Sequence, residues 1–136
     1  TLLIPGYNDS GIELEKLSCW MVEQLGPEVP LHFSAFHPDW KMRDVERTPH
    51  QTLIRAREIA LANGIHHVYL GNVHDHQGSS TYCHACGQIL IGRDWYVLSD
   101  WNLDPQGRCS NCLEPCPGHF EPTPGNWGSR RKPVQV

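Results

Sequence analysis

The second half of this chain is organised around Tyr82-Cys83-His84-Ala85-Cys86-Gly87, whose cysteine spacing recurs in Cys109-Ser110-Asn111-Cys112. A Cys-x-x-Cys turn presents two thiolates from one tight bend, and two such turns complete a closed tetrahedral shell. Gly87, directly after the first turn, supplies a flexible position, whereas Leu113 after the second does not. The pattern predicts one structural zinc ion with four metal ligands: Cys83, Cys86, Cys109 and Cys112.

Other uses of the six cysteines are weaker alternatives. A rubredoxin-like iron site has the same sulfur geometry, so iron is possible in place of zinc. Cys109, Cys112 and Cys116 could also be three ligands of an iron–sulfur cluster; otherwise Cys116 is a free thiol. Disulfides are disfavoured, because no secretion signal is visible. We expect the ribbon to be unfolded without its metal.

The segments around the cysteines predict a small β-hairpin domain. Residues 88–91 and 95–98 flank a predicted turn at 92–94, and 104–107 turn the chain toward the second cysteine pair. The aromatic side chains here either fill the hairpin core, which we favour, or form a protein-binding face: Tyr82, Trp95, Tyr96 and Trp101. Four residues could form a second metal site, although a polar connector is the favoured interpretation: His74, Asp75, His76 and His84.

The first half alternates predicted strands and helices. Strands are expected near 2–4, 31–36 and 65–70, with helices at 10–25 and from Thr48 to 62. Ser10 and Glu13 have capping-box spacing, and Thr48, Pro49 and Gln51 predict a second capped start. The connections are long, so the strands are parallel and right-handed crossovers place both helices on one face. Something outside this segment must cover the other face, or further strands must close a barrel.

Composition excludes several classes of function. The net charge is −4 with a pI near 6.1, and no basic stripe suggests nucleic acid as a partner. No apolar run approaches the roughly 20 residues of a membrane span, so we expect no membrane contact and a cytoplasmic location. The chain begins within a strand and without Met, which we interpret as the sign of a fragment.

Three short motifs follow the predicted strands: Leu3-Ile4-Pro5-Gly6-Tyr7-Asn8-Asp9, Phe36-His37-Pro38-Asp39-Trp40-Lys41-Met42, and Gly71-Asn72 with Tyr82-Cys83 beyond it. In this order they resemble the C-terminal part of an AmmeMemoRadiSam system radical S-adenosylmethionine (SAM) enzyme, which is similar to pyruvate formate-lyase activating enzymes. The resemblance runs from residue 1 to about residue 120.

The resemblance implies an α/β fold in which residues 1–73 are the C-terminal βαβαβ part of a partial (β/α) TIM-like barrel. Residues 74–116 would be the zinc-ribbon-like four-cysteine domain and 117–136 a disordered Pro/Gly-rich tail. It also implies that Ile4, Pro5 and His37 contact SAM. The family has been associated with Memo-like and AMMECR1-like proteins, which are therefore candidate partners.

One departure from the family affects catalysis. Radical SAM chemistry needs a [4Fe–4S] cluster held by a Cys-x3-Cys-x2-Cys motif, whereas Cys109, Cys112 and Cys116 run in the reverse order. We therefore expect the cluster in a missing N-terminal part, no catalytic residue in this chain, and no activity of the chain alone. The alternative function is a free-standing zinc-ribbon module that binds a protein partner.

Overall fold

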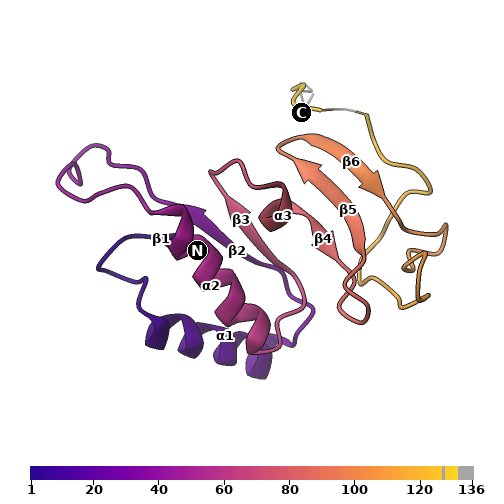
Figure 1. The fold of residues 1–136 in the computed structure, drawn as a ribbon, viewed down its shortest axis with the longest axis horizontal. Coiled ribbons are helices and arrows are strands. Elements are labelled where there is room, and N and C mark those ends of the chain that lie inside the picture. Colours follow the sequence, from indigo (N-terminus) through magenta and orange to yellow (C-terminus); the bar gives the residue numbers. More distant parts are fainter. Residues whose placement is uncertain (127, 132–136) are drawn as a thin grey trace, which may run out of the picture. The chain divides into compact units, whose positions relative to one another are not determined.

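The computed structural model describes residues 1–126 and 128–131. The chain forms two compact units, which divide between Ser79 and Ser80 (Figure 1). The boundary predicted from the sequence, after residue 73, lies six residues earlier. The segment between them is not only a connector, because it contains a short helix, α3 (His76–Ser79), that belongs to the first unit.

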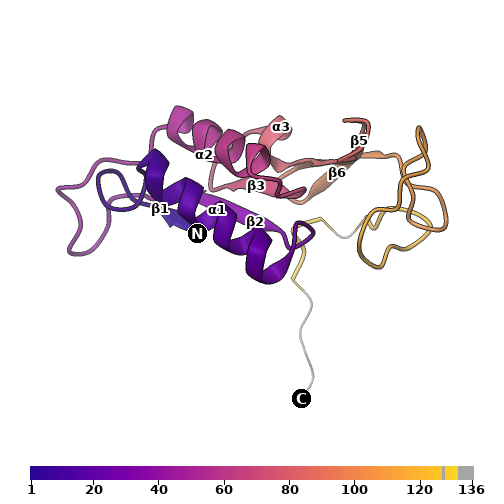
Figure 2. The same ribbon diagram turned by 90° about the horizontal axis from the view of Figure 1, so that it is seen from below.

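The first unit is a mixed α/β structure, as predicted. Its elements in chain order are β1 (Leu2–Leu3), α1 (Gly11–Leu25), β2 (Leu31–Ala35), α2 (His50–Ala62), β3 (Val68–Gly71) and α3. The strands form one parallel sheet in the order β1-β2-β3. Helices α1 and α2 pack side by side (Figures 1 and 2).

The core of this unit lies between the two helices and one face of the sheet. Leu3 and Phe33 from the strands and Leu14 and Leu53 from the helices are almost completely buried. Burial alternates along β2, so the side chains at positions 32 and 34 point to the opposite face. There His32 is exposed and its ring stacks on partly buried Tyr69 at 4.9 Å. The helix-free face is therefore less buried, as the sequence predicted.

The two long helices begin differently. Helix α1 starts with the predicted capping box: the Glu13 N–H donates to Ser10 Oγ at 3.3 Å, and Ser10 Oγ donates to Glu13 Oε2 at 3.0 Å. The predicted Thr48 cap of α2 is wrong, because the helix begins at His50 with Pro49 as its N-cap and without a side-chain cap. The Thr48 hydroxyl is engaged elsewhere: it accepts from the Phe36 N–H at 2.8 Å and donates to the Leu3 carbonyl at 2.6 Å.

The second unit contains an antiparallel sheet in the order β4-β5-β6, formed by β4 (Thr81–Tyr82), β5 (Ile89–Asp94) and β6 (Val97–Trp101). The predicted turn at 92–94 is wrong, since these residues belong to β5. The chain instead reverses at Trp95 and Tyr96, between the paired residues Asp94 and Val97. Trp95 adopts a positive φ of 52° to make this tight turn.

The aromatic residues of the hairpin divide into two groups. Trp95 and Tyr96 are 53% and 64% exposed, so the prediction that they fill a core is wrong for them. Trp101 does pack inward, with its ring edge-on to Phe120 at a centroid distance of 6.4 Å. Phe120 belongs to the tail predicted to be disordered, so the beginning of that tail is packed. Residue 127 and residues 132–136 of the tail lie outside the described residues.

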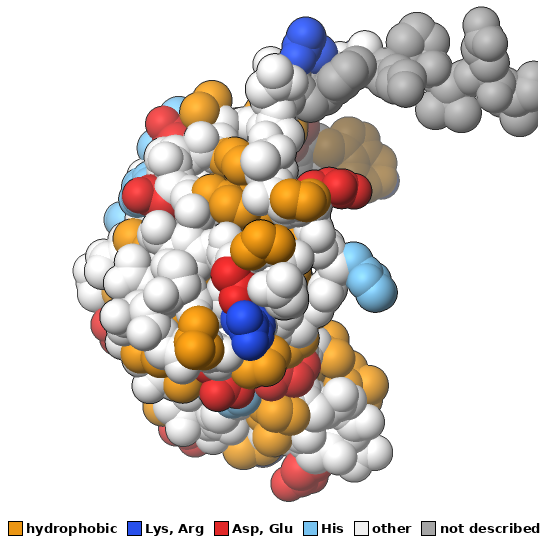
Figure 3. Space-filling view, turned by 90° about the vertical axis from the view of Figure 1, so that its right-hand side faces the viewer, with side chains coloured by type: hydrophobic (Ala, Val, Ile, Leu, Met, Phe, Trp, Pro, Cys, Tyr) orange, Lys and Arg blue, Asp and Glu red, His pale blue; other side chains and the backbone are white. Residues whose placement is uncertain are grey.

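Figure 3 shows one face of the molecule, on which hydrophobic side chains are interspersed with polar ones and Lys and Arg are sparse. The view agrees with the slightly acidic net charge of −4. Among the described residues, no helix combines the length and hydrophobicity needed to cross a bilayer.

Candidate metal centre

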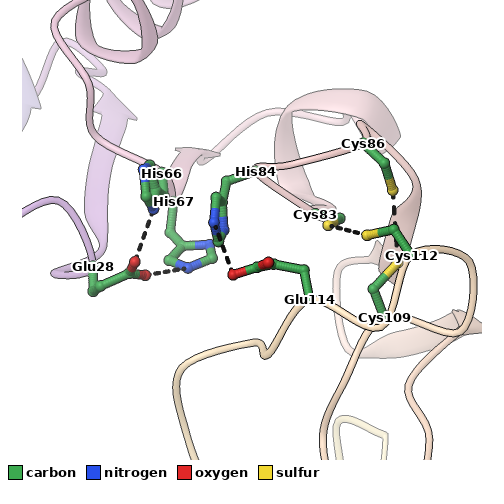
Figure 4. A network of polar contacts seen from close by, with 9 residues as sticks. All are labelled: Glu28, His66, His67, Cys83, His84, Cys86, Cys109, Cys112 and Glu114. Atoms are coloured by element: carbon green, nitrogen blue, oxygen red, sulfur yellow. Dashed lines mark hydrogen bonds and ion pairs between the residues drawn. The ribbon is translucent and has the colours of Figure 1, made fainter.

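The structure brings together the four cysteines selected from the sequence. Their sulfur atoms all lie within 4.8 Å of one another, and in Figure 4 they point toward a common centre. Cys83 Sγ is 3.6 Å from Cys112 Sγ, and Cys86 Sγ is 3.7 Å from Cys109 Sγ. These separations exclude disulfides, whose sulfurs are about 2.05 Å apart. Sulfurs bound tetrahedrally to zinc at about 2.3 Å are roughly 3.8 Å apart, so the group could hold a metal ion such as zinc.

The two cysteine turns have the same backbone hydrogen bonds. In the first, the Gly87 N–H donates to the Cys83 carbonyl at 2.9 Å and the Cys83 N–H donates to the Gln88 carbonyl at 2.8 Å. The second turn repeats both bonds at 2.9 Å: the Leu113 N–H donates to the Cys109 carbonyl, and the Cys109 N–H to the Glu114 carbonyl. The two turns therefore hold their pairs of sulfur atoms with the same backbone hydrogen bonds.

Strand pairing holds these turns in position. The first turn lies between β4 and β5, and the second follows a bridge between Leu103 and Cys109. Asp104 organises the loop that enters the second turn, because its carboxylate accepts from the N–H groups of Gln106 and Arg108, each at 2.9 Å, and from Arg108 Nε at 2.7 Å. The Arg108 N–H is the main reason that the pKa of Asp104 is lowered.

The ionisation of the thiols reflects the crowding of four sulfurs. The Asn111 side-chain amide donates to Cys86 Sγ at 3.5 Å and, with the Gln88 backbone, lowers the pKa of Cys86 to about 6. For Cys112, the Glu114 backbone lowers the pKa, but burial and the neighbouring thiols raise it, with a net value of about 12. Thiols this close cannot all ionise without a cation between them. A bound divalent metal would supply that charge and hold all four as thiolates.

Cys116 is not part of this cluster of ligands. It is buried in the core beside Cys83 and Cys109, and its N–H donates to the Gly107 carbonyl. Among the described residues, the cysteine group that could hold a metal does not include Cys116, and the groups found do not include His74 or His76. Within the second unit, His84 Nε2 instead lies 3.5 Å from a carboxylate oxygen of Glu114, beside the cysteines (Figure 4).

The three residues implied to contact SAM lie at the carboxyl edge of the parallel sheet. Ile4 and Pro5 directly follow β1, and His37 follows the neighbouring strand β2 and is exposed. The turn after β1 is held by two polar side chains of the motif. Asn8 Oδ1 accepts from the Ile4 N–H at 2.7 Å, and Asp9 Oδ1 accepts from the Gly6 N–H at 2.8 Å. The motif therefore has a structural role in addition to the proposed cofactor contacts.

The sequence interpretation missed several residues of functional interest. Asn111 donates to a sulfur of the metal centre, although nothing in its residue type singled it out. Asp104 and Leu113 were noted only as a turn residue and as a position without glycine, and their hydrogen bonds at the centre were not predicted. In the first unit, His50 pairs with Asp75 across 25 residues of sequence, with 2.7 Å between Nε2 and Oδ2. The signal that could have found this pair is positional, because His50 starts the helix that follows β2 and Asp75 lies in the loop that follows the neighbouring strand β3.

Comparison with known proteins gives one informative relative. Neither a described protein family nor a solved structure matches the chain. The chain is 45% identical over 114 residues to a protein of the archaeon Methanocaldococcus jannaschii that is called "Uncharacterized protein MJ0808". The match covers 83% of this chain but only 34% of the relative. The chain thus spans about a third of the length of a longer protein to which it is clearly similar.

Proposed function

We propose that the second unit is a zinc ribbon in which Cys83, Cys86, Cys109 and Cys112 hold one structural zinc ion. The observation that carries this proposal is the convergence of four sulfurs at separations near those of a tetrahedral site. Four protein ligands leave no open position, so the ion stabilises the fold and does no chemistry itself. Metal binding is worth on the order of 10–16 kcal/mol in zinc-finger peptides, more than a core this small supplies.

Metal analysis of the purified chain tests the zinc proposal. We expect one zinc per chain, and loss of that zinc when Cys109, the fully buried ligand, is replaced by Ser. The matched control is Cys19→Ser, because Cys19 is an exposed thiol in helix α1. Iron in place of zinc after growth with both metals would refute the metal assignment. Retention of zinc by the Cys109 variant would refute the ligand set.

We further propose that the chain is the C-terminal part of a radical SAM enzyme, with residues 1–73 contributing strands to its (β/α) barrel. Three features support this. The motifs resemble that family in their order along the chain. The sheet is parallel and one face lacks helices, as expected of a barrel wall. The relative from M. jannaschii is about three times as long as the matched segment, which leaves room for the remaining strands.

In this proposal Ile4 and Pro5 lie against the adenine of SAM, and His37 contacts its ribose or methionine part. A [4Fe–4S] cluster in the missing part would supply the electron that cleaves SAM to methionine and a 5′-deoxyadenosyl radical. Hydrogen abstraction from a substrate would follow from that cleavage. The residues of this chain bind and orient SAM at the sheet edge, and they supply no cluster ligand.

The enzyme proposal is tested most directly on the longer relative. We expect the M. jannaschii protein, after anaerobic reconstitution with iron and sulfide, to form 5′-deoxyadenosine from SAM and dithionite. The present chain, treated identically, should form none. A relative that fails to bind a cluster, or that binds one and leaves SAM intact, would refute the proposal. Product formation by the chain alone would refute the requirement for a missing cluster domain.

The alternative is a zinc-ribbon module that binds a protein partner. It is favoured by the exposure of Trp95, Tyr96 and Val97, three adjacent apolar side chains at the tip of the β5–β6 hairpin. Aromatic residues in such positions are enriched at interfaces. The two functions predict different effects of one substitution. If the chain is a protein-binding module, replacing Trp95 by Ser would abolish binding of the partner. If the chain belongs to a radical SAM enzyme, the corresponding substitution in the longer relative would leave SAM cleavage unaffected.

A further inference from the structure

A second candidate site lies in the first unit, away from the cysteines. A cleft of about 440 Å³ opens where the chain leaves strands β2 and β3 and is lined by Arg47, Thr48, Pro49, His50, Val73 and His74. Its volume is within the range of small-molecule sites, roughly 300–1,000 Å³. Ligands of open parallel sheets bind at this edge, beyond the carboxyl ends of the strands.

The lining of the cleft is basic. It contains Arg47 and two histidines but no carboxylate. Arg47 is exposed, and within the described part of the chain its side chain makes no hydrogen bond or ion pair. Its guanidinium is therefore available to a ligand, and its planar set of donors suits an oxyanion.

Helix α2 adds further donors beside Arg47. The helix has 13 residues and starts at His50, and no side chain caps its first turn. The first N–H groups of a helix point away from its body and carry partial positive charge. Here they begin at a residue that lines the cleft, so they reinforce the charge of Arg47.

The carboxylate of Asp75 holds the His50 ring in place. Its Nε2 lies 2.7 Å from Asp75 Oδ2, while Asp75 Oδ1 accepts from the Gly78 N–H at 2.7 Å. Asp75 is mostly buried, with 13% of its side chain exposed, whereas half of the His50 side chain is exposed. Asp75, an acceptor, thus takes the Nε2–H of His50 and orients the ring, and when the ring is protonated its Nδ1–H can donate to a ligand. A carboxylate–imidazole pair of this kind is common where a histidine binds or moves a proton.

We propose that this cleft binds the phosphate group of a small molecule, with Arg47 and His50 as direct ligands and Asp75 as a positioning residue. Phosphate is favoured over a carboxylate because the donors come from three sources, a guanidinium, an imidazolium and a helix start, and a tetrahedral oxyanion can accept from all of them. The proposal goes beyond the SAM contacts proposed above, since Ile4, Pro5 and His37 do not line the cleft.

The test is a titration of the zinc-loaded full chain with inorganic phosphate, followed by ¹H–¹⁵N NMR spectra. We expect saturable shifts of the backbone amides of Arg47, His50 and Gln51. Arg47→Ala should weaken binding roughly tenfold, as expected for loss of a charge-assisted bidentate contact, and Arg47→Lys should weaken it less. Arg43→Ala, which removes an exposed arginine of the same loop, is the matched control and should bind normally.

Asp75→Asn tests the positioning role separately. It should change the ¹⁵N shifts of the His50 ring, which report its tautomer, and weaken phosphate binding less than Arg47→Ala does. Three results would overturn the proposal: absence of shifts at His50, equal binding by the Arg47→Ala and control variants, or saturation by malonate but not by phosphate. The last would assign the cleft to carboxylates. Similar spectra of each variant without phosphate establish that it is folded.

Discussion

Leu113 occupies in the second cysteine turn the position that Gly87 holds in the first. Both residues have left-handed backbones, with φ of 65° and 74°, and each donates its N–H to the carbonyl of the first cysteine of its turn at 2.9 Å. The left-handed region costs a residue with a side chain roughly 1–2 kcal/mol. Leu113 is 58% exposed, so burial of its side chain offsets little of this cost.

Leu113→Gly should therefore stabilise the zinc-loaded ribbon. After allowing for the greater freedom of glycine in the unfolded chain, we expect a gain of about 0.5–1 kcal/mol. The measurement is thermal unfolding followed by near-UV circular dichroism of the hairpin tryptophans. The matched control is Gly87→Leu, which should destabilise the ribbon, since a Cβ added there meets no atom within 4 Å but the positive φ strains the backbone. A loss of stability in both variants would show that the Leu113 side chain itself is needed.

Removal of the metal should affect the two units differently. With a strong chelator we expect the near-UV signal of Trp101 and its partner Phe120 to disappear, because their packing lies in the small core that contains the cysteines. The helical signal at 222 nm should remain, because the helices α1, α2 and α3 all belong to the first unit. Added zinc should restore the near-UV signal. A hairpin that keeps its near-UV spectrum after complete metal removal would contradict the requirement for metal.

The features predicted correctly from the sequence are those that depend on local pattern. Helix α1 follows from the spacing of its apolar residues and from the Ser10–Glu13 box, and the cysteine cluster follows from two pairs with the same spacing. The parallel sheet follows from the length of its connections. Each of these inferences needs only residues near one another in the chain, or one repeated motif.

The features that were missed depend on competition between distant partners. Thr48 is a residue type that favours the N-cap position. Its hydroxyl instead donates to the Leu3 carbonyl, 45 residues away in the sequence, and this contact forms only in the folded sheet. The hairpin turn was expected at Gly92 because glycine favours turns. The register of β5 on β6 instead places the reversal at Trp95, which tolerates a positive φ there. The SAM contacts of Ile4, Pro5 and His37 remain predictions.

Thr48 links the ends of two strands, and its hydroxyl should be important for stability. The side chain is 3% exposed, and it bonds both the Phe36 N–H and the Leu3 carbonyl. Thr48→Val keeps the shape but leaves both buried groups without a partner, which should cost about 1–3 kcal/mol. Urea unfolding followed at 222 nm measures this loss. Thr48→Ser, which retains the hydroxyl, should lose much less, and equal losses in the two variants would assign the effect to the methyl group.

The pairing of Asp75 with His50 predicts a pH-dependent contribution to the stability of the first unit. Burial, the largest influence, raises the pKa of Asp75, but the Gly78 N–H and His50 outweigh it, so the pKa lies below the ordinary value of 3.8. A carboxyl whose pKa is lower in the folded state stabilises it above the unfolded pKa, and this contribution is lost as the pH falls through the folded pKa. Asp75→Asn should therefore destabilise the unit at pH 7 by about 1 kcal/mol, a value reduced for partial exposure of the pair.

The difference between Asp75→Asn and the unchanged chain should shrink as the pH falls from 3.8 through the lower pKa of folded Asp75, because the carboxyl is then protonated and, like the amide, uncharged. Urea midpoints at 222 nm, measured from pH 7 downward, follow this convergence. Asp44→Asn, in an exposed loop, should match the unchanged chain at every pH. A difference that stays constant across the range would mean that Asp75 acts through its shape and hydrogen bonds, and that its charge contributes nothing.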